Sequence, residues 1–320
     1  MSLQPQTRVI GVTAEDARGT QQTVVFNKEF YDASPISPAR DVVKQGNLAG
    51  RKTRYAPNYV GTEAGTATIM TDFKGSGLNA TEPKIGEILK SAGFWWTEDI
   101  SGTLDGYVMD GTLPCSTMTY QDSVYQCGTA PKGSTEYLIG AVPVVTISSE
   151  GVGKPLKLSA ELTGGYLKDA VDETTLYAVS GADATNCLKF VGGVYTIGGT
   201  SIDIKTFEFT SNAEVAMETD PTKSNGTLIK HHHISDLRGR TLTLGYTKPL
   251  KSVKDFDAEF SSETIYTEIV LQFLSESGET CDITFTLPQA SEWSDENADS
   301  YVITNATFDV DEVSIVFDVV

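Results

Sequence analysis

Alternation of apolar and polar residues constrains the fold of this chain more than any other feature of its sequence. After about residue 135, apolar side chains recur at every second position, for example from Leu156 to Leu162 and from Val313 to Phe317. Successive side chains of a strand point to opposite faces of a sheet, so this period indicates strands with one buried face. We therefore predict a mainly β fold, an antiparallel sandwich or barrel.

One segment has the helical period instead. Its apolar residues are spaced i, i+3, i+4 and i+7, which predicts an α-helix over about residues 82–92. We expect Thr81 to be the N-cap, Pro83 to lie in the first turn and Gly93 to follow the last turn. The apolar stripe, which should pack against the strands, consists of Ile85, Ile88, Leu89 and Ala92.

The chain is expected to form a single domain over residues 1–320, because no change in composition marks a linker. Residues 1–65 contain stretches rich in Pro, Gly, Asn and Ser and predict an amino-terminal arm followed by a long loop. We expect the β core over residues 66–168 and 193–320, with a surface excursion over residues 169–192.

Two local irregularities are expected within the β core. The apolar pair Ile202 and Ile204 is out of phase with Phe207 and Phe209, which indicates a β-bulge near Lys205–Thr206. A turn between two strands is expected at residues 276–279, which read Glu-Ser-Gly-Glu.

Charge is distributed very unevenly along the chain. Of the net charge of −19, −16 comes from residues 255–320, which contain sixteen Asp or Glu and no Lys or Arg. We expect these acids on strand faces and in loops such as residues 291–300. So acidic a surface repels nucleic-acid phosphate, and sequence-specific DNA binding is not expected. The densest basic stretch lies near the other end of the sequence and contains Arg40, Lys44, Arg51, Lys52 and Arg54.

The sequence gives no sign of a membrane partner. No apolar run approaches the roughly 18 residues of a transmembrane helix. The first residues also lack the basic start and apolar core of a signal peptide. We therefore expect the protein to fold in a cytoplasm.

The cysteines and histidines do not predict a metal site. The four cysteines have no metal-ligand spacing. Cys115 and Cys127 are symmetric about Gln121, which places them across a hairpin turning near residues 121–123. They are either a disulfide or, as a cytoplasm favours, reduced thiols. His231–His233 are consecutive, and neighbours in a strand point to opposite faces, so one chain does not readily bring all three to one ion.

No catalytic constellation is recognisable. No Ser-His-Asp, Cys-His or paired-carboxylate arrangement can be argued from the residues present. The glycine pairs at 164–165, 192–193 and 198–199 do not open helices, so they indicate turns rather than phosphate cradles. We expect a protein that is not an enzyme and that carries no cofactor.

The order of several motifs resembles the tail tube (major tail) protein family of siphophages. A strand ending in Gly-Ser-Gly at residues 75–77 precedes the Pro-started segment 82–94, which ends in Ser-Ala-Gly-Phe. A Gly-Lys-Pro strand at residues 153–166, the segment 207–240 and an acidic final strand pair follow. The resemblance extends over about residues 35–318.

The resemblance implies a structural virion protein, assembled in the host cytoplasm and located in the virion tail. Proteins of this family form hexameric rings that stack into a tube around a tape-measure protein. Tail-terminator and tail-tip proteins would then be further partners. The tube later conducts the genome into the host, and genomic DNA passes through an acidic lumen without specific binding.

Charge segregation suggests how copies of such a protein meet. Residues 1–65 would serve as an arm and stacking loop, and on this hypothesis the basic loop from Arg40 to Arg54 contacts the acids of residues 255–318 in an adjacent subunit or ring. Exposed ion pairs contribute only about 0–1 kcal/mol each. They would therefore set register and orientation, while β pairing and apolar burial supply most of the affinity. The expected inter-subunit residues are Arg40, Lys44, Arg51, Lys52, Arg54 and Tyr55.

Two other readings remain open at the level of the sequence. A β-sandwich adhesion or carbohydrate-binding module would also explain the strands, and Trp95–Trp96 could stack on a sugar. Against this, a tryptophan pair directly after a helix is more often part of the core. A capsid decoration protein shares the virion setting with a tail tube protein.

Overall fold

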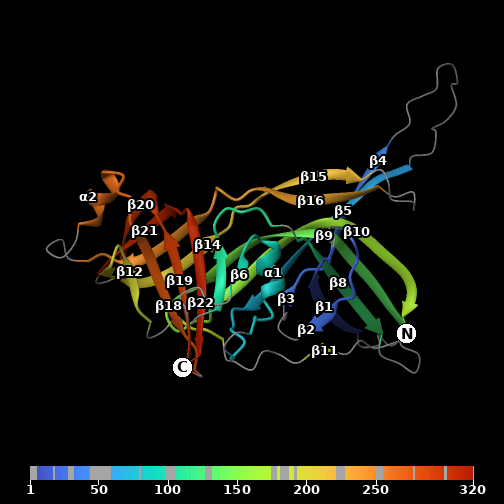
Figure 1. The fold of residues 1–320 in the computed structure, drawn as a ribbon, viewed down its shortest axis with the longest axis horizontal. Coiled ribbons are helices and arrows are strands. Elements are labelled where there is room, and N and C mark those ends of the chain that lie inside the picture. Colours follow the sequence, from blue (N-terminus) through green and yellow to red (C-terminus); the bar gives the residue numbers. More distant parts are fainter. Residues whose placement is uncertain are drawn as a thin grey trace, which may run out of the picture.

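The structure, a computed structural model, describes most of the chain as two β-sheets and two short helices (Figure 1). Most strand pairs are antiparallel, while β11–β2 and β16–β5 are parallel. The prediction of a mainly β fold with antiparallel sheets and a packed helix is confirmed. The described residues are 6–16, 19–27, 32–43, 59–78, 81–97, 105–114, 116–126, 132–173, 179–180, 187–190, 193–220, 228–249, 255–276, 278–298 and 301–319.

The larger sheet has 15 strands and branches at its central strand, β9. Its main path runs through β11 (Val179–Ser180), β2 (Val25–Asn27), β1 (Gln6–Ala14), β8 (Met118–Gln126), β9 (Lys132–Ser149), β10 (Lys157–Glu173), β5 (Tyr59–Asp72), β16 (Leu228–Asp236) and β15 (Glu214–Asp220). A branch leaves β9 through β14 (Asp203–Thr210), β17 (Thr241–Thr247), β21 (Tyr301–Asp309) and β20 (Gln289–Ala298). Two further strands, β3 (Asp32–Ala33) and β4 (Ser37–Val43), pair with β5.

The smaller sheet packs against this branch to form a sandwich. Its seven strands are β13 (Thr200–Ser201), β12 (Tyr195–Ile197), β18 (Glu268–Leu274), β19 (Glu279–Thr286), β22 (Glu312–Val319), β7 (Asp105–Met109) and β6 (Trp95–Thr97). Burial alternates along β19 and β18, as the period of two predicts. Aromatic rings join the layers: Phe207 of β14 lies 5.6 Å from Phe273 of β18, and Phe209 lies 5.6 Å from Phe285 of β19. Each fully buried ring stabilises the fold by roughly 1.5–3 kcal/mol.

The predicted helix is present as α1 (Gly86–Ser91) but starts later than expected. Each of the four residues of its apolar stripe is at most 1% exposed. Gly93 follows the helix, as predicted, and has a φ of +99°. The predicted N-cap at Thr81 is wrong. Pro83–Ile85 form a turn in which the Gly86 N–H donates to the Pro83 carbonyl at 2.9 Å, so Ile85 is the N-cap.

A second helix, α2 (Phe256–Ser261), was not predicted. The Asp255 carboxylate accepts a hydrogen bond from the Ala258 N–H at 3.4 Å, and Phe256 and Phe260 are buried on one face. An acidic N-cap followed by apolar residues four apart was the available signal. With only six residues, α2 is too short for its period to stand out from the flanking strands.

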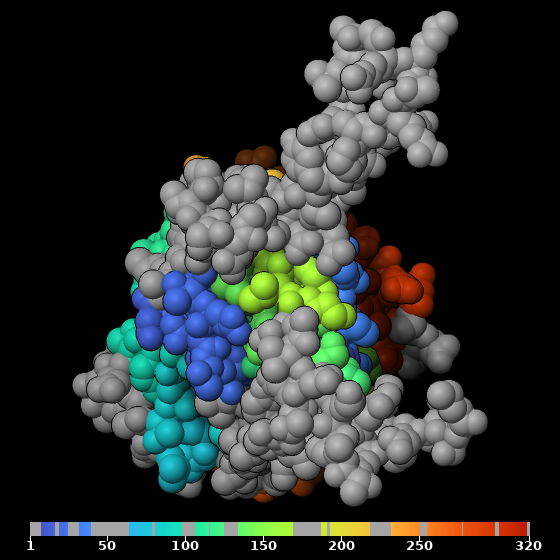
Figure 2. Space-filling view, turned by 90° about the vertical axis from the view of Figure 1, so that its right-hand side faces the viewer, coloured from blue at the N-terminus to red at the C-terminus, as the bar shows by residue number. Residues whose placement is uncertain are grey.

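Much of the predicted amino-terminal arm belongs to the sheet. β1 pairs with β8 along its whole length, and Val12 is only 4% exposed. Arg8 donates to both carboxylate oxygens of Asp122, at 2.8 and 2.7 Å, and to the carbonyls of Ala33 and Ser34. Figure 2 shows these blue amino-terminal residues beside green residues from the middle of the chain. An arm over residues 1–65 is therefore wrong for the described part of that range.

The predicted surface excursion at residues 169–192 is also wrong where the structure describes it. Residues up to Glu173 continue β10, and residues 179–180 form β11. Leu188 and Phe190 are buried, because the backbone of Leu188 bonds with both Phe73 and Leu156 between the sheets. The remaining residues of the range lie outside the described chain.

The local predictions divide between confirmed and wrong. The register of β14 against β17 shifts between Ile204 and Thr206, so the bulge is confirmed. The turn at residues 276–279 is confirmed by Gly278, with a φ of +92°, and so is the turn at Gly198–Gly199. Gly164–Gly165 do not turn: they lie inside β10, where a Cβ on Gly164 would sit 3.0 Å from the Ala141 Cα of β9.

The predicted hairpin at residues 121–123 is wrong as well. These residues lie in the middle of β8, which pairs with β1 on one side and β9 on the other. Cys115, Cys127 and Gly192 lie outside the described residues.

Candidate assembly surface

The predicted basic site begins on β4 and continues beyond the described residues. Arg40 lies in β4 opposite Glu63 of β5, and Val43 lies opposite Tyr59 at the end of this antiparallel pair. The segment of residues 44–58 begins and ends at this strand pair. Five of the predicted residues belong to that segment and lie outside the described chain: Lys44, Arg51, Lys52, Arg54 and Tyr55.

Carboxylates gather on α2, on the residues that follow it and on β20, a region we call the acidic end. Five of its seven carboxylate residues are exposed, and Asp257 and Glu259 are half-buried. Exposed like charges repel one another in a monomer, so this region favours a cationic partner. Its members are Asp255, Asp257, Glu259, Glu263, Glu292, Asp295 and Glu296.

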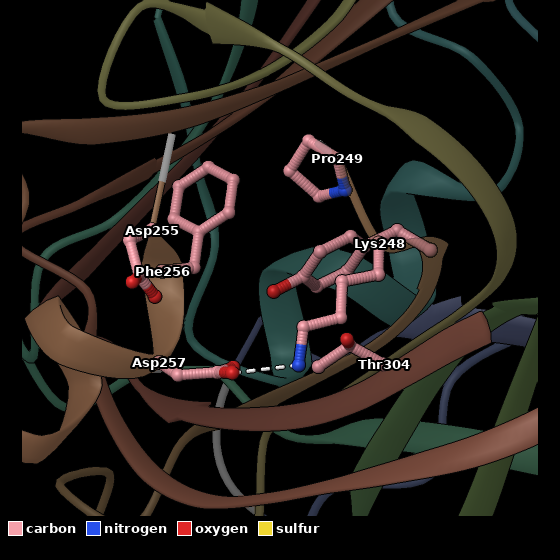
Figure 3. Close-up of a pocket in the computed structure, with 7 residues that line it drawn as sticks. Lys248, Pro249, Asp255, Phe256, Asp257 and Thr304 are labelled. Carbon is pink, nitrogen blue, oxygen red and sulfur yellow. Dashed lines mark hydrogen bonds and ion pairs between the residues drawn. The ribbon is translucent and has the colours of Figure 1, made fainter. Parts of the chain in front are cut away.

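Lys248 holds the two parts of the acidic end together, and Figure 3 shows its bond to Asp257. Its Nζ bonds the Asp257 carboxylate of α2 at 2.6 Å and also bonds Asp295 of β20. Hydrogen bonds to these two carboxylates raise the pKa of Lys248. Thr304 of β21 donates to Asp295 at 2.8 Å, which fixes the second carboxylate. The group is an intramolecular clamp, and the sequence did not predict it.

Figure 3 also shows the small cavity beside this clamp. Phe256 and Pro249 form part of its wall, and Tyr246, which lines it too, is fully buried. Burial raises the pKa of Tyr246 well above its ordinary value. With an ammonium already bonded to two carboxylates and a neutral phenol, the cavity suits packing of α2 rather than proton transfer.

β20 is the most unusual strand of the molecule. In the part of the chain that the structure describes, it has one neighbouring strand, β21, and on its other edge only Gln289 is paired, by a bridge to Ile265. Every residue from Ser291 to Asn297 is exposed, including Trp293 at 40%, so both faces of the strand meet solvent. A free edge of this length is a template for pairing with another chain. The prediction of a loop at residues 291–300 is wrong for residues 291–298.

β4 and the acidic end lie at opposite ends of the molecule. Figure 1 shows β4 and the adjoining end of β5 at one extreme of the longest axis and α2, β20 and β21 at the other. The basic segment therefore starts from β4 and β5 at the end far from α2 and β20.

The histidine triplet occupies β16, where His232 is 4% exposed and His233 is half-buried. Adjacent positions of this strand face opposite sides, as the sequence predicted. Within the described residues, no group of three His, Cys, Asp or Glu side chains is placed to hold a metal ion. Neither described helix has the length and apolar character needed to cross a lipid bilayer.

The tryptophan pair does not form a joint platform. Trp95 and Trp96 lie in β6, an edge strand of the smaller sheet, so their side chains point to opposite faces. Trp96 packs edge-on against Tyr107 at 4.9 Å, and Trp95 is 36% exposed. This arrangement agrees with the core-packing reading for Trp96 and offers a sugar only one ring.

No protein-family model matches the sequence, and no curated protein matches it significantly.

Proposed function

We propose that this protein is a self-assembling structural subunit, in which copies join through sheet edges and oppositely charged ends into stacked rings that form a tube. The resemblance to tail tube proteins supplies the particular form: hexameric rings in the virion tail of a long-tailed phage. In that setting the tube conducts the genome, and tape-measure, tail-terminator and tail-tip proteins are its other partners.

The observation that carries the proposal is the strand β20. After Gln289 this strand has no partner along one edge within the described residues, and its residues 291–297 are exposed, so it buries little in the monomer. Pairing with a neighbouring copy would satisfy its free N–H and C=O groups. In a closed ring each copy offers one such edge and receives another, so no edge is left over.

The two charged ends support a head-to-tail arrangement. An acidic end repels another acidic end, whereas it attracts the basic segment that follows β4. Contacts between two different surfaces generate rings or filaments rather than closed two-fold dimers. The carboxylates Glu292, Asp295 and Glu296 also discourage β20 from pairing with arbitrary strands.

The test is assembly of a charge-reversed variant. Replacing Arg51, Lys52 and Arg54 with Glu should block tube elongation while leaving a folded protein, because every buried residue of the described core is kept. Tube length and yield would be measured by negative-stain electron microscopy, and folding by circular dichroism. Tubes of normal length and yield would refute the role of this segment.

A matched control separates a local effect from a change in net charge. The variant with Lys74, Lys84 and Lys154 replaced by Glu changes the net charge by the same amount. These lysines lie outside the β4–β5 pair, so this control should still assemble. Equal loss of tubes in both variants would mean that bulk charge alone governs assembly.

A further inference from the structure

Two exposed apolar side chains lie on the paired segments that lead into β20, and a third lies on β20 itself. Ile265 is 58% exposed, Leu287 49% and Trp293 40%. We call these three residues the apolar corner. Ile265 lies opposite Gln289 at the start of β20, and the Leu287 N–H donates to the carbonyl of Thr267 at 3.1 Å, so the first two project from paired segments.

Buried aromatic rings support this corner from beneath. Phe260 of α2 lies 5.6 Å from Trp293 and 6.3 Å from Tyr266, the neighbour of Ile265. The Tyr266 hydroxyl donates to the Glu259 carboxylate at 2.8 Å. The exposed side chains therefore stand on a rigid base, which lowers the entropy lost when a partner binds.

Backbone strain at the corner points the same way. Leu287 has a φ of +51° and Glu263 a φ of +56°, and these are two of the three non-glycine residues with positive φ in the described chain. The left-handed conformation costs an L-residue roughly 1–2 kcal/mol. Leu287 gains little from packing in return, because half of its side chain meets solvent. A strained and exposed leucine is therefore better explained by a contact outside its own chain.

The chemistry around the corner selects the occupant. Glu263 and Glu292 are exposed, and Gln289 donates to the Glu263 carbonyl at 3.1 Å, so the apolar centre has an acidic rim. Interfaces commonly have this plan, with apolar anchors surrounded by charged residues. A second identical corner would bring like charges together, which excludes two-fold self-pairing.

We infer that the apolar corner is the docking site for the basic segment of a second copy, residues 40–55. That segment is the densest basic stretch of the chain, and it also contains Leu48 and Tyr55, which suit an apolar centre. The inference rests on the proposed function and adds the acceptor site to it. Apolar contact supplies the affinity, and the acidic rim orients the cations.

Complementation between two full-length variants tests the inference. The acceptor variant combines Ile265→Ser with Leu287→Gly, which removes the two most exposed apolar anchors and leaves the charge unchanged. The donor variant carries Glu at positions 51, 52 and 54. Each variant alone should stop at one small particle, either a monomer or a single ring, and lose about tenfold or more of its sedimentable polymer. Mixed one to one, the two variants can still form one contact, between the basic segment of the acceptor variant and the apolar corner of the donor variant. The mass of the particle should therefore double in sedimentation velocity.

The outcomes separate this inference from the proposed function. An acceptor variant that still forms normal tubes, or a mixture that does not double, overturns the docking site and leaves tube formation standing. If the mixture of the two variants doubles in mass but the wild-type protein never forms tubes, the docking site holds and the tube proposal fails. Because Gly suits a positive φ, the acceptor variant should keep its melting temperature, which shows that the lost assembly does not come from misfolding.

Discussion

Replacing Glu15 with alanine should destabilise the folded protein by roughly 3–5 kcal/mol, which is a large part of the 5–15 kcal/mol typical of a folded domain. The Glu15 side chain is in the core, since the residue is 5% exposed. Its Oε2 accepts hydrogen bonds from the Gly19 N–H and the Thr117 hydroxyl, both at 2.6 Å. Its Oε1 accepts from the Gly140 N–H at 2.7 Å and from the Thr119 hydroxyl at 2.9 Å.

The magnitude follows from these four donors. Removing the carboxylate leaves two backbone N–H groups without this acceptor, at about 1–3 kcal/mol each. The threonine hydroxyls rotate and so add less. Glu15→Gln keeps the volume but turns an amide NH₂ toward donors, so we expect a loss of roughly 2–3 kcal/mol.

Urea unfolding, followed by circular dichroism, measures the effect. It is best done in the charge-reversed variant at positions 51, 52 and 54, so that assembly does not contribute to stability. Glu292→Ala, at an exposed carboxylate of β20, is the control and should change stability by less than about 0.5 kcal/mol. A loss below about 1 kcal/mol for Glu15→Ala would refute the argument that this carboxylate anchors β1 and the segment after it.

Two further predictions concern the fold. Gly193→Ala should lower the free energy of unfolding in urea by about 2–3 kcal/mol, since its Cβ would lie 1.7 Å from the backbone oxygen of Gln272. Gly199→Ala, whose Cβ would meet nothing within 4 Å, should lower it by only about 1 kcal/mol because of its positive φ. Equal losses of stability in the two variants would contradict the steric reasoning. Burial, with a contribution from Asp318, raises the pKa of Asp282, so the folded state holds this proton more tightly than the unfolded chain, and the resulting stability is lost as pH rises from about 4 through the raised value. Asp282→Asn should therefore stabilise the protein at pH 7 but not near pH 3.5, and a gain that is the same at both values would contradict this assignment.

Sequence periodicity predicted the sandwich because alternation is local. The strands around Phe209 and Phe285 bury every second residue, and that information lies within each strand. The bulge between Ile204 and Thr206 was predictable for the same reason, since a change of phase appears within a few residues. Gly93 was recognisable because its conformation ends a helix whose stripe is itself periodic.

Long-range pairing was not predictable from composition. β1 pairs with β8, more than one hundred residues away, and Arg8 meets Asp122 only in the folded protein. A stretch rich in Pro and Gly therefore resembled an arm. β20 was missed because it buries neither face and so has no apolar alternation, and its strand conformation depends on pairing with β21.

The assembly surface was predictable only in outline. Counting charges identified a basic segment and an acidic carboxyl-terminal quarter. Which carboxylates share one end depended on the packing of α2 against β20 and on the Lys248 clamp. The apolar corner has no signal in the sequence, because exposed and buried leucines look the same until the fold is known.

Electron microscopy of the purified full-length protein over a range of concentrations tests the central claim most directly. Copies that complete one another's sheet edges should appear as rings at low concentration and as hollow tubes at high concentration. Single particles of one subunit at every concentration would contradict the account.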